Sequence, residues 1–221
     1  MQLILFDCDG TLVDSQALIQ AAMTGAFRTL GLAPPERART LSVVGLSLPE
    51  AMARMLPEAS PATHLAAAEA YKTDAIALRD DAAYAEPFFS GARETIVALA
   101  NKPGVRLGLA TGKSRRGVDR LIAHAGLEGV FTAIETADSA PSKPHPGMIL
   151  QAMLTAGVEA AATTMIGDTT FDLDMARSAG VRGIGVAWGY HPVSALRASG
   201  AHHIVQTFAE LDDLLGPRTT P

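Results

Sequence analysis

Two carboxylates stand one residue apart immediately after the first apolar run of the chain. They belong to Asp7 and Asp9, and a Gly-Thr pair follows them. Carboxylates held that close repel each other unless a cation or a shared proton intervenes. An aspartate can also act as a nucleophile and form an aspartyl-phosphate, provided that a metal and positive side chains neutralise the charge. The pair therefore predicts phosphoryl chemistry, and the alternative interpretation is a polar turn that closes a strand.

Three further polar turns carry groups that could serve the same chemistry. A hydroxyl and a backbone N–H at a strand-to-helix turn suit a phosphate, and a lysine can offset its charge. Carboxylates without sulfur or clustered histidine suit a hard cation, and Mg²⁺ is the usual choice for phosphoryl transfer. Taken singly, each turn has an ordinary explanation as a helix cap or a surface loop. The residues are Thr111, Gly112 and Lys113 in the first turn, Lys143 in the second, and Asp168 and Asp172 in the third.

The elements that must position these groups follow from the hydrophobic pattern. The run at 3–6 is continuously apolar, which is typical of a strand buried on both faces. From residue 92 onward, short apolar runs alternate with helical patterns, which predicts a parallel sheet covered on both faces by right-handed crossovers. Ligands bind at the carboxyl edge of such a sheet. We therefore expect a Rossmann-like doubly wound α/β fold with strands at 3–6, 105–110, 131–134, 164–166, 183–186 and 203–205.

A different kind of sequence interrupts this alternation. Residues 15–82 are rich in alanine and show helical patterns at 18–30, after 48 and after 61, without a convincing strand. We interpret this segment as an inserted α-helical cap. The predicted catalytic core is then made of residues 1–14 and 83–221.

Composition limits the classes of function. The 221 residues are 48% hydrophobic and 19% charged with a net charge of -5, and no basic stripe suggests a nucleic-acid partner. No apolar run is long enough to cross a bilayer, and the N-terminus lacks a secretion signal. The single cysteine, Cys8, excludes an internal disulfide, and strand alternation predicts that it is buried and points away from the two aspartates. We expect a cytoplasmic protein, and its oligomeric state is left open.

The four motifs together resemble those of the haloacid dehalogenase superfamily. The run from Asp7 to Ser15 resembles its first motif, and 110–113, 143–146 and 167–172 resemble the second, third and fourth. Four motifs in this order are highly specific, and they span almost the whole chain. The helical insertion resembles the cap of that superfamily. Its segment 44–46, centred on Gly45, is similar to the substrate-facing cap loop of phosphoglycolate-phosphatase-like members.

The resemblance implies a role for each residue. Asp7 attacks phosphorus, and Asp9 protonates the leaving oxygen and then activates water. Mg²⁺ is held by the Asp7 carboxylate, the Asp9 backbone carbonyl and Asp168. Asp172 supports either the metal or Lys143, which offsets the charge of the nucleophile. Phosphoryl oxygens are bound by Thr111 and the N–H of Gly112, and Gly45 lies against the substrate. An acid at the position of Asp9 favours phosphate esters over the dehalogenase and phosphonatase reactions.

The expected function is that of a Mg²⁺-dependent phosphatase acting on a small phosphorylated metabolite, phosphoglycolate-like in type. Three alternatives use similar residue types. A sugar-phosphate mutase of the β-phosphoglucomutase type returns the phosphoryl group to its product. A pyrophosphatase or nucleotidase uses another substrate, and a phospho-accepting signalling module keeps the phosphoryl group. Product analysis separates the phosphatase from the mutase.

Overall fold

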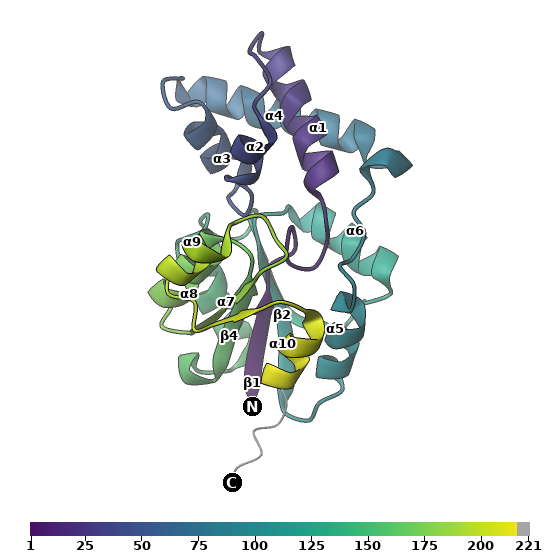
Figure 1. Ribbon diagram of the computed structural model, residues 1–221, viewed down its shortest axis with the longest axis vertical. Helices are drawn as coiled ribbons and strands as arrows, with labels where there is room; N and C mark the ends of the chain where they lie inside the picture. The colour runs from purple at the N-terminus through teal and green to yellow at the C-terminus, as the bar shows by residue number, and fades with distance from the viewer. Residues whose placement is uncertain (216–221) are drawn as a thin grey trace.

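The computed structural model describes residues 1–215, so positions 216–221 of the predicted core lie outside the described residues. Within the described part, six parallel strands form one sheet in the order β3-β2-β1-β4-β5-β6, at the centre of the lower body in Figure 1. This order is that of a doubly wound Rossmann-like sheet and confirms the predicted fold class. The strands are β1 (Gln2–Phe6), β2 (Val105–Thr111), β3 (Phe131–Thr136), β4 (Thr163–Gly167), β5 (Arg182–Val186) and β6 (His203–Val205).

Helices cover both faces of this sheet, as the alternating pattern predicts. Buried side chains of α5, α6 and α10 pack on one face, and those of α7 and α8 pack on the other. The helix α9 lies beside β5 and β6. The helices are α5 (Ala92–Ala100), α6 (Arg115–Ala125), α7 (Gly147–Ala156), α8 (Thr170–Ser178), α9 (Val193–Ala198) and α10 (Phe208–Leu215), with a short 3₁₀ helix η2 (Ala160–Ala162) before β4.

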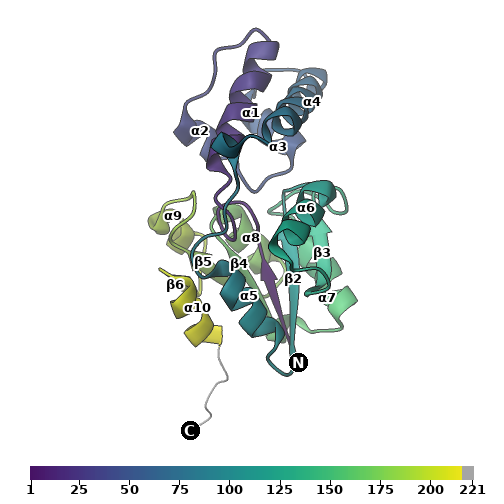
Figure 2. The same cartoon turned by 90° about the vertical axis from the view of Figure 1, so that its right-hand side faces the viewer.

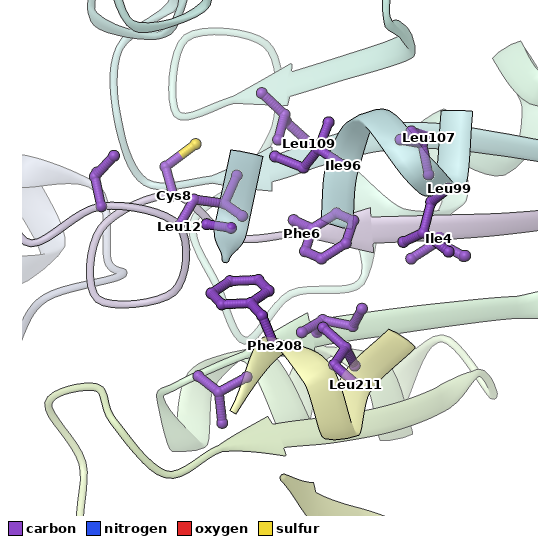
Figure 3. Packing of buried hydrophobic residues seen from close by; sticks show 14 of the residues in the cluster. Ile4, Phe6, Cys8, Leu12, Ile96, Leu99, Leu107, Leu109, Phe208 and Leu211 are labelled. Atoms are coloured by element: carbon purple, nitrogen blue, oxygen red, sulfur yellow. The ribbon is translucent and has the colours of Figure 1, made fainter. Parts of the chain in front are cut away.

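The packing of β1 explains why residues 3–6 are continuously apolar. Successive side chains of a strand point to opposite faces. Ile4 and Phe6 enter the cluster with α5 and α10, shown in Figure 3, whereas Leu3 and Leu5 enter the cluster with α7 on the other face. All four are at most 1% exposed. A polar residue at any of these positions would be buried without a partner, so residues 3–6 are all apolar, whereas the exposed first residue of the strand, Gln2, is polar.

The segment between β1 and α5 is helical, which confirms the expectation of helices without strands. Figures 1 and 2 show its helices grouped beyond the carboxyl ends of the strands. The periodic pattern predicts three of the four helices and misses α2, which is only one turn long. None of the helices among residues 1–215 is long and apolar enough to cross a membrane. The four are α1 (Gln16–Thr29), α2 (Arg37–Leu41), α3 (Leu48–Met55) and α4 (Pro61–Leu78), and η1 (Ala82–Tyr84) follows them.

This helical segment has a small apolar core of its own, built from α1, α3 and α4. Met23, Phe27 and Met52 belong to it, and Phe171 from the start of α8 reaches up into the same cluster. The ring of Phe171 also lies 4.7 Å from the guanidinium carbon of Arg54 in α3. The helical segment therefore packs on the sheet-bearing body through α8, beside the site predicted from the fourth motif.

Two connections join the helical segment to the sheet, and they pair with each other. The backbone N–H of Asp14 donates to the carbonyl of Pro87, and the N–H of Phe89 donates to the carbonyl of Leu12, both at 2.9 Å. The chain therefore leaves and returns at adjacent points, close to the boundaries that the sequence predicts. The division into a core of 1–14 and 83–221 and a cap of 15–82 stays a prediction.

Candidate active site

Strand register brings the first and fourth motifs together. In the parallel pair of β1 and β4, Phe6 lies opposite Ile166, so Asp7 and Asp168 emerge from neighbouring strand ends. Asp172 joins them from the first turn of α8. One carboxylate oxygen of each of the three lies within 4.8 Å of the others, and none of the three residues is exposed to solvent. The sequence prediction of converging carboxylates is thus met by Asp7, Asp168 and Asp172.

Lys143 supplies the cation of this cluster. Its ammonium nitrogen Nζ lies 2.6 Å from Oδ1 of Asp172 and 3.0 Å from Oδ1 of Asp7, and the residue is 1% exposed. Burial by itself lowers the pKa of Lys143, but the charges of Asp172 and Asp7 outweigh burial and hold the pKa above its ordinary value. The lysine is therefore protonated, and it does not behave as the surface lysine that its loop sequence would also allow.

One lysine does not balance three buried carboxyl groups. Burial raises the pKa of Asp7 to about 7, although Lys143 and the hydroxyl of Thr111 oppose that shift. Burial also raises the pKa of Asp168 well above its ordinary value, and the charges of Asp172 and Asp7 add to the effect. The protein alone therefore disfavours the fully ionised cluster, and a further cation would stabilise it.

Hydrogen bonding shows which oxygens are left for such a cation. Oδ2 of Asp7 is buried and has no hydrogen-bond partner among the described residues. Asp168 accepts one hydrogen bond from the Thr11 hydroxyl and one from the backbone N–H of Tyr190, at 2.9 and 2.8 Å. A metal is consistent with the unpartnered oxygen and with the excess of negative charge. Carboxylate oxygens are the donors that Mg²⁺ prefers.

Both carboxylate oxygens of Asp172 already accept hydrogen bonds from protein groups. Its Oδ1 accepts a hydrogen bond from Lys143, and its Oδ2 accepts from both the backbone N–H and the hydroxyl of Thr169. The hydroxyl of Thr169 in turn accepts from the N–H of Asp172, which completes a capping box at the start of α8. Of the two roles left open by the sequence, this arrangement favours support of Lys143.

The side chain of Asp9 takes a different direction from that of Asp7. Its Oδ1 accepts from Nζ of Lys113 at 3.0 Å, and the same Nζ lies 2.5 Å from Oε1 of Glu86. Burial lowers the pKa of Lys113, but the charges of Asp9 and Glu86 reverse this and raise it. Asp9 is thus an ion-paired carboxylate outside the cluster of Asp7. Sequence reasoning missed Glu86, whose only signal is its place beside the proline where the chain returns to the core.

The loop between α2 and α3 rests directly on the second motif. A Cβ atom at Gly112 would lie 2.6 Å from the carbonyl oxygens of both Gly45 and Leu46, so only glycine allows this approach. Gly45 has a φ of 97°, and a Cβ there would lie 3.2 Å from Oγ1 of Thr169. Thr111, the last residue of β2, is buried beside them. The loop thus contacts residues of two motifs.

We expect Gly45→Val to reduce kcat/KM for a large phosphate ester about tenfold more than for acetyl phosphate. A side chain at Gly45 is strained at this φ and pushes the loop away from the core, whereas acetyl phosphate needs no contact with the loop. Steady-state kinetics with both substrates measure the difference. Gly31→Val is the matched control, because Gly31 also has a positive φ but no other described atom within 4 Å of its built Cβ. Equal losses on both substrates that track a fall in Tm would contradict a specificity role for Gly45.

The segment after β5 packs beneath the site. The indole N–H of Trp188 donates to the carbonyl of Thr11, and its ring lies 4.7 Å from that of Phe208. The hydroxyl oxygen of Tyr190 accepts a hydrogen bond from the backbone N–H of Ser15 at 3.0 Å. Tyr190 therefore connects Asp168 to the start of the helical segment. The sequence alone does not predict this connection, because it depends on tertiary contacts.

Cys8 is buried in the apolar cluster of Figure 3, which confirms its predicted place. Burial raises the pKa of its thiol, and the charges of Asp7 and Asp9 raise it further. A thiol held in its neutral form is a poor nucleophile. Cys8 therefore contributes packing to this site.

A cavity of about 640 Å³ opens between the helical segment and the strand ends, and we refer to it as the chamber. Asp9, Gly112 and Lys113 line its core side, and Gly45 lines it from the loop. The predicted site residues thus form two adjoining groups. Asp7, Lys143, Asp168 and Asp172 make the buried cluster, while Asp9, Gly45 and Gly112 face the chamber.

The chain is similar to known proteins in both sequence and fold. The family described as Haloacid dehalogenase-like hydrolase matches residues 4–186. The probable phosphatase IndB of Dickeya dadantii is 37% identical over 212 residues, which cover 95% of this chain and 91% of that protein. The phosphoglycolate phosphatase of Rhodospirillum rubrum is 32% identical over 225 residues, covering 96% and 90%. A hydrolase from Pseudomonas syringae has the same fold, with a TM-score of 0.86, 22% identity and complete coverage of both chains.

Proposed function

Because the chain belongs to the haloacid dehalogenase-like hydrolase family, we propose that it hydrolyses a small phosphomonoester through an aspartyl-phosphate on Asp7. The chain is a phosphoric monoester hydrolase, and the names of its relatives make phosphoglycolate the first ester to test. One observation carries the assignment of the nucleophile. Asp7 is buried at the end of the central strand, with Lys143 at 3.0 Å and one carboxylate oxygen without a partner among the described residues.

The reaction proceeds in two steps on these side chains. A carboxylate oxygen of Asp7 forms a bond to phosphorus as the ester P–O bond breaks. Asp9, which enters this step protonated on the oxygen that Lys113 does not bind, gives that proton to the leaving oxygen. Asp9 then takes a proton from water, whose oxygen attacks phosphorus and releases inorganic phosphate and free Asp7. Lys143 stabilises the negative charge near Asp7 in both steps. The hydroxyl of Thr111 and the N–H of Gly112 hold the phosphoryl oxygens.

Asp7, Asp168 and the backbone carbonyl of Asp9 would hold Mg²⁺, with Asp172 supporting them through Lys143. When bound, the ion supplies positive charge that offsets the phosphoryl oxygens and the carboxylates. The residues 15–82 act as a cap that closes over the chamber and excludes bulk water. Release of inorganic phosphate tests this proposal, because a mutase of the β-phosphoglucomutase type would return an isomerised ester instead.

Metal removal should abolish turnover. We expect EDTA-treated protein to release no phosphate, and added Mg²⁺ to restore release, because the unbalanced carboxyl groups of the cluster need a cation to ionise together. A second measurement does not depend on activity: Mg²⁺ should raise the Tm of the wild-type protein and leave that of Asp168→Asn nearly unchanged. Full activity in metal-free buffer would contradict the metal site.

A further inference from the structure

The chamber is larger than a two-carbon acid requires. Its volume of about 640 Å³ lies within the range of about 300–1,000 Å³ that is usual for pockets holding drug-sized ligands. Asp9, which protonates the leaving oxygen in the proposed reaction, lies at its core side. The space above Asp9 is therefore where the alcohol part of the ester must sit.

Most of the side chains that line the chamber from the helical segment are apolar. A carboxylate placed against this apolar wall would lose its hydration without gaining hydrogen bonds, whereas an apolar surface would be favoured there. The helices α1 and α4 and the loop before α3 contribute the apolar residues of this wall. Residues on it are Leu18, Ile19, Val44, Leu46, Ala75 and Ile76.

Positive charges around the chamber are mostly matched by carboxylates of the protein. Lys113 is bound between Asp9 and Glu86, and Glu86 also accepts from Arg120 at 3.5 Å. Within residues 1–215, Arg116 is the chamber arginine without an acidic partner, and it is exposed on α6 at the solvent side.

On the helical side, Arg79 at the end of α4 also lines the chamber, and its Nε lies 3.5 Å from Oδ2 of Asp80. Lys72 lines the chamber too and pairs with Glu69 at 2.7 Å. The cations that the helical segment offers to the chamber are therefore already next to carboxylates of the protein.

Tyr71 of α4 adds one polar group to this wall. Its ring packs against the core of the helical segment, and the residue lines the chamber. Burial raises the pKa of Tyr71, and the charge of Asp9 raises it further, which agrees with their facing the same space. A tyrosine so placed can pack its ring on a flat body and donate one hydrogen bond to it.

We propose that the chamber binds the alcohol part of the substrate, and that this part is an uncharged group with a ring and an apolar face. Phosphoglycolate is then a poor substrate for this enzyme. The proposal rests on the phosphatase reaction at Asp7 and names the class of ester that this reaction uses. Tyr71 and Ile76 are the residues that select it, and the phosphoryl group stays at the buried cluster.

A series of esters tests the chamber separately from the chemistry. 2-Phenylethyl phosphate and ethyl phosphate release alcohols of similar acidity, so their difference in kcat/KM reports contact beyond the phosphoryl group. With the full chain and Mg²⁺, we expect 2-phenylethyl phosphate to exceed ethyl phosphate about ten- to a hundredfold in kcat/KM. Phosphoglycolate should be no better than ethyl phosphate.

Two exposed positions on α4 provide a matched pair of variants. Ile76 lines the chamber and is 48% exposed, whereas Leu65 is 58% exposed and lies outside the chamber lining. We expect Ile76→Asp to lower kcat/KM for 2-phenylethyl phosphate much more than kcat/KM for ethyl phosphate, which reduces the advantage of the larger ester. Leu65→Asp should alter neither substrate. A Tm measurement on both variants accounts for any common effect on folding.

The outcomes separate this inference from the proposed function. Hydrolysis of all three esters at similar rates, or a preference for phosphoglycolate, would overturn the inference and leave the phosphatase intact. An equal effect of Ile76→Asp and Leu65→Asp would also overturn it. Failure to release phosphate from any ester in the presence of Mg²⁺ would overturn the proposed function and this inference with it.

Discussion

Asp7→Asn is expected to lower phosphate release by about four orders of magnitude or more while the protein stays folded. Asparagine has the same shape but offers no anionic oxygen to attack phosphorus, so the first step is lost. The fold should tolerate the change, because burial already raises the pKa of Asp7 to about 7 and an uncharged group removes part of that cost. Phosphate release and thermal unfolding measure the two effects.

Asp174→Asn is the control for this variant. Asp174 lies on α8 near the site, but its side chain is partly exposed and pairs with Arg177 at 2.8 Å. We expect activity and Tm close to those of the wild type, since exposed ion pairs contribute little. An Asp7→Asn protein that retains wild-type turnover would remove Asp7 from the mechanism.

Lys143→Met should damage stability and activity together. Methionine approximates the volume of the lysine stem but leaves the carboxylates of Asp7 and Asp172 buried without their cation. Breaking a buried ion pair from one side costs about 3–5 kcal/mol of unfolding free energy. Activity should fall by at least about a hundredfold, because the charge that offsets the nucleophile is gone. Chemical denaturation in metal-free buffer measures the first effect, and phosphate release with Mg²⁺ measures the second.

A second substitution separates these two effects. Asp172→Asn in the Lys143→Met background removes one of the unpaired charges and keeps a side-chain oxygen that can cap α8. We expect it to recover a large part of the stability without recovering activity. Lys102→Met provides the control, because Lys102 pairs with Asp212 at a partly exposed site. Equal losses of stability in Lys143→Met and Lys102→Met would contradict the buried charge cluster.

The sequence predicts most of the fold because each core element has a strong local pattern. Residues 3–6 of β1 are all apolar since both faces of the strand are buried there, and the predicted strands at 105–110, 131–134 and 164–166 agree with β2, β3 and β4. The helix α2 escaped prediction because one turn is too short to display a periodic apolar face. Its position depends on tertiary packing, which no local pattern encodes.

The site was predictable where it depends on strand ends and unpredictable where it depends on side-chain direction. Parallel strands deliver Asp7 and Asp168 to the same edge, so their meeting follows from the topology. The partners of Asp9 do not follow from its place in the motif. Asp9 turns toward Lys113, and Lys113 meets Glu86 from a linker 27 positions away in sequence. Tyr190 likewise reaches Asp168 from a loop whose sequence carries no sign of that contact.

The central claim is that Asp7 carries the phosphoryl group, and Asp9→Asn tests it most directly. Acetyl phosphate needs no proton on its leaving group, so this variant should still form the aspartyl-phosphate and then hydrolyse it slowly. Mass spectrometry of the quenched reaction should show one added phosphoryl group, located on Asp7, that is absent from the variant carrying both Asp7→Asn and Asp9→Asn. An Asp9→Asn protein that turns over like the wild type, or a phosphoryl group found on another residue, would contradict the mechanism.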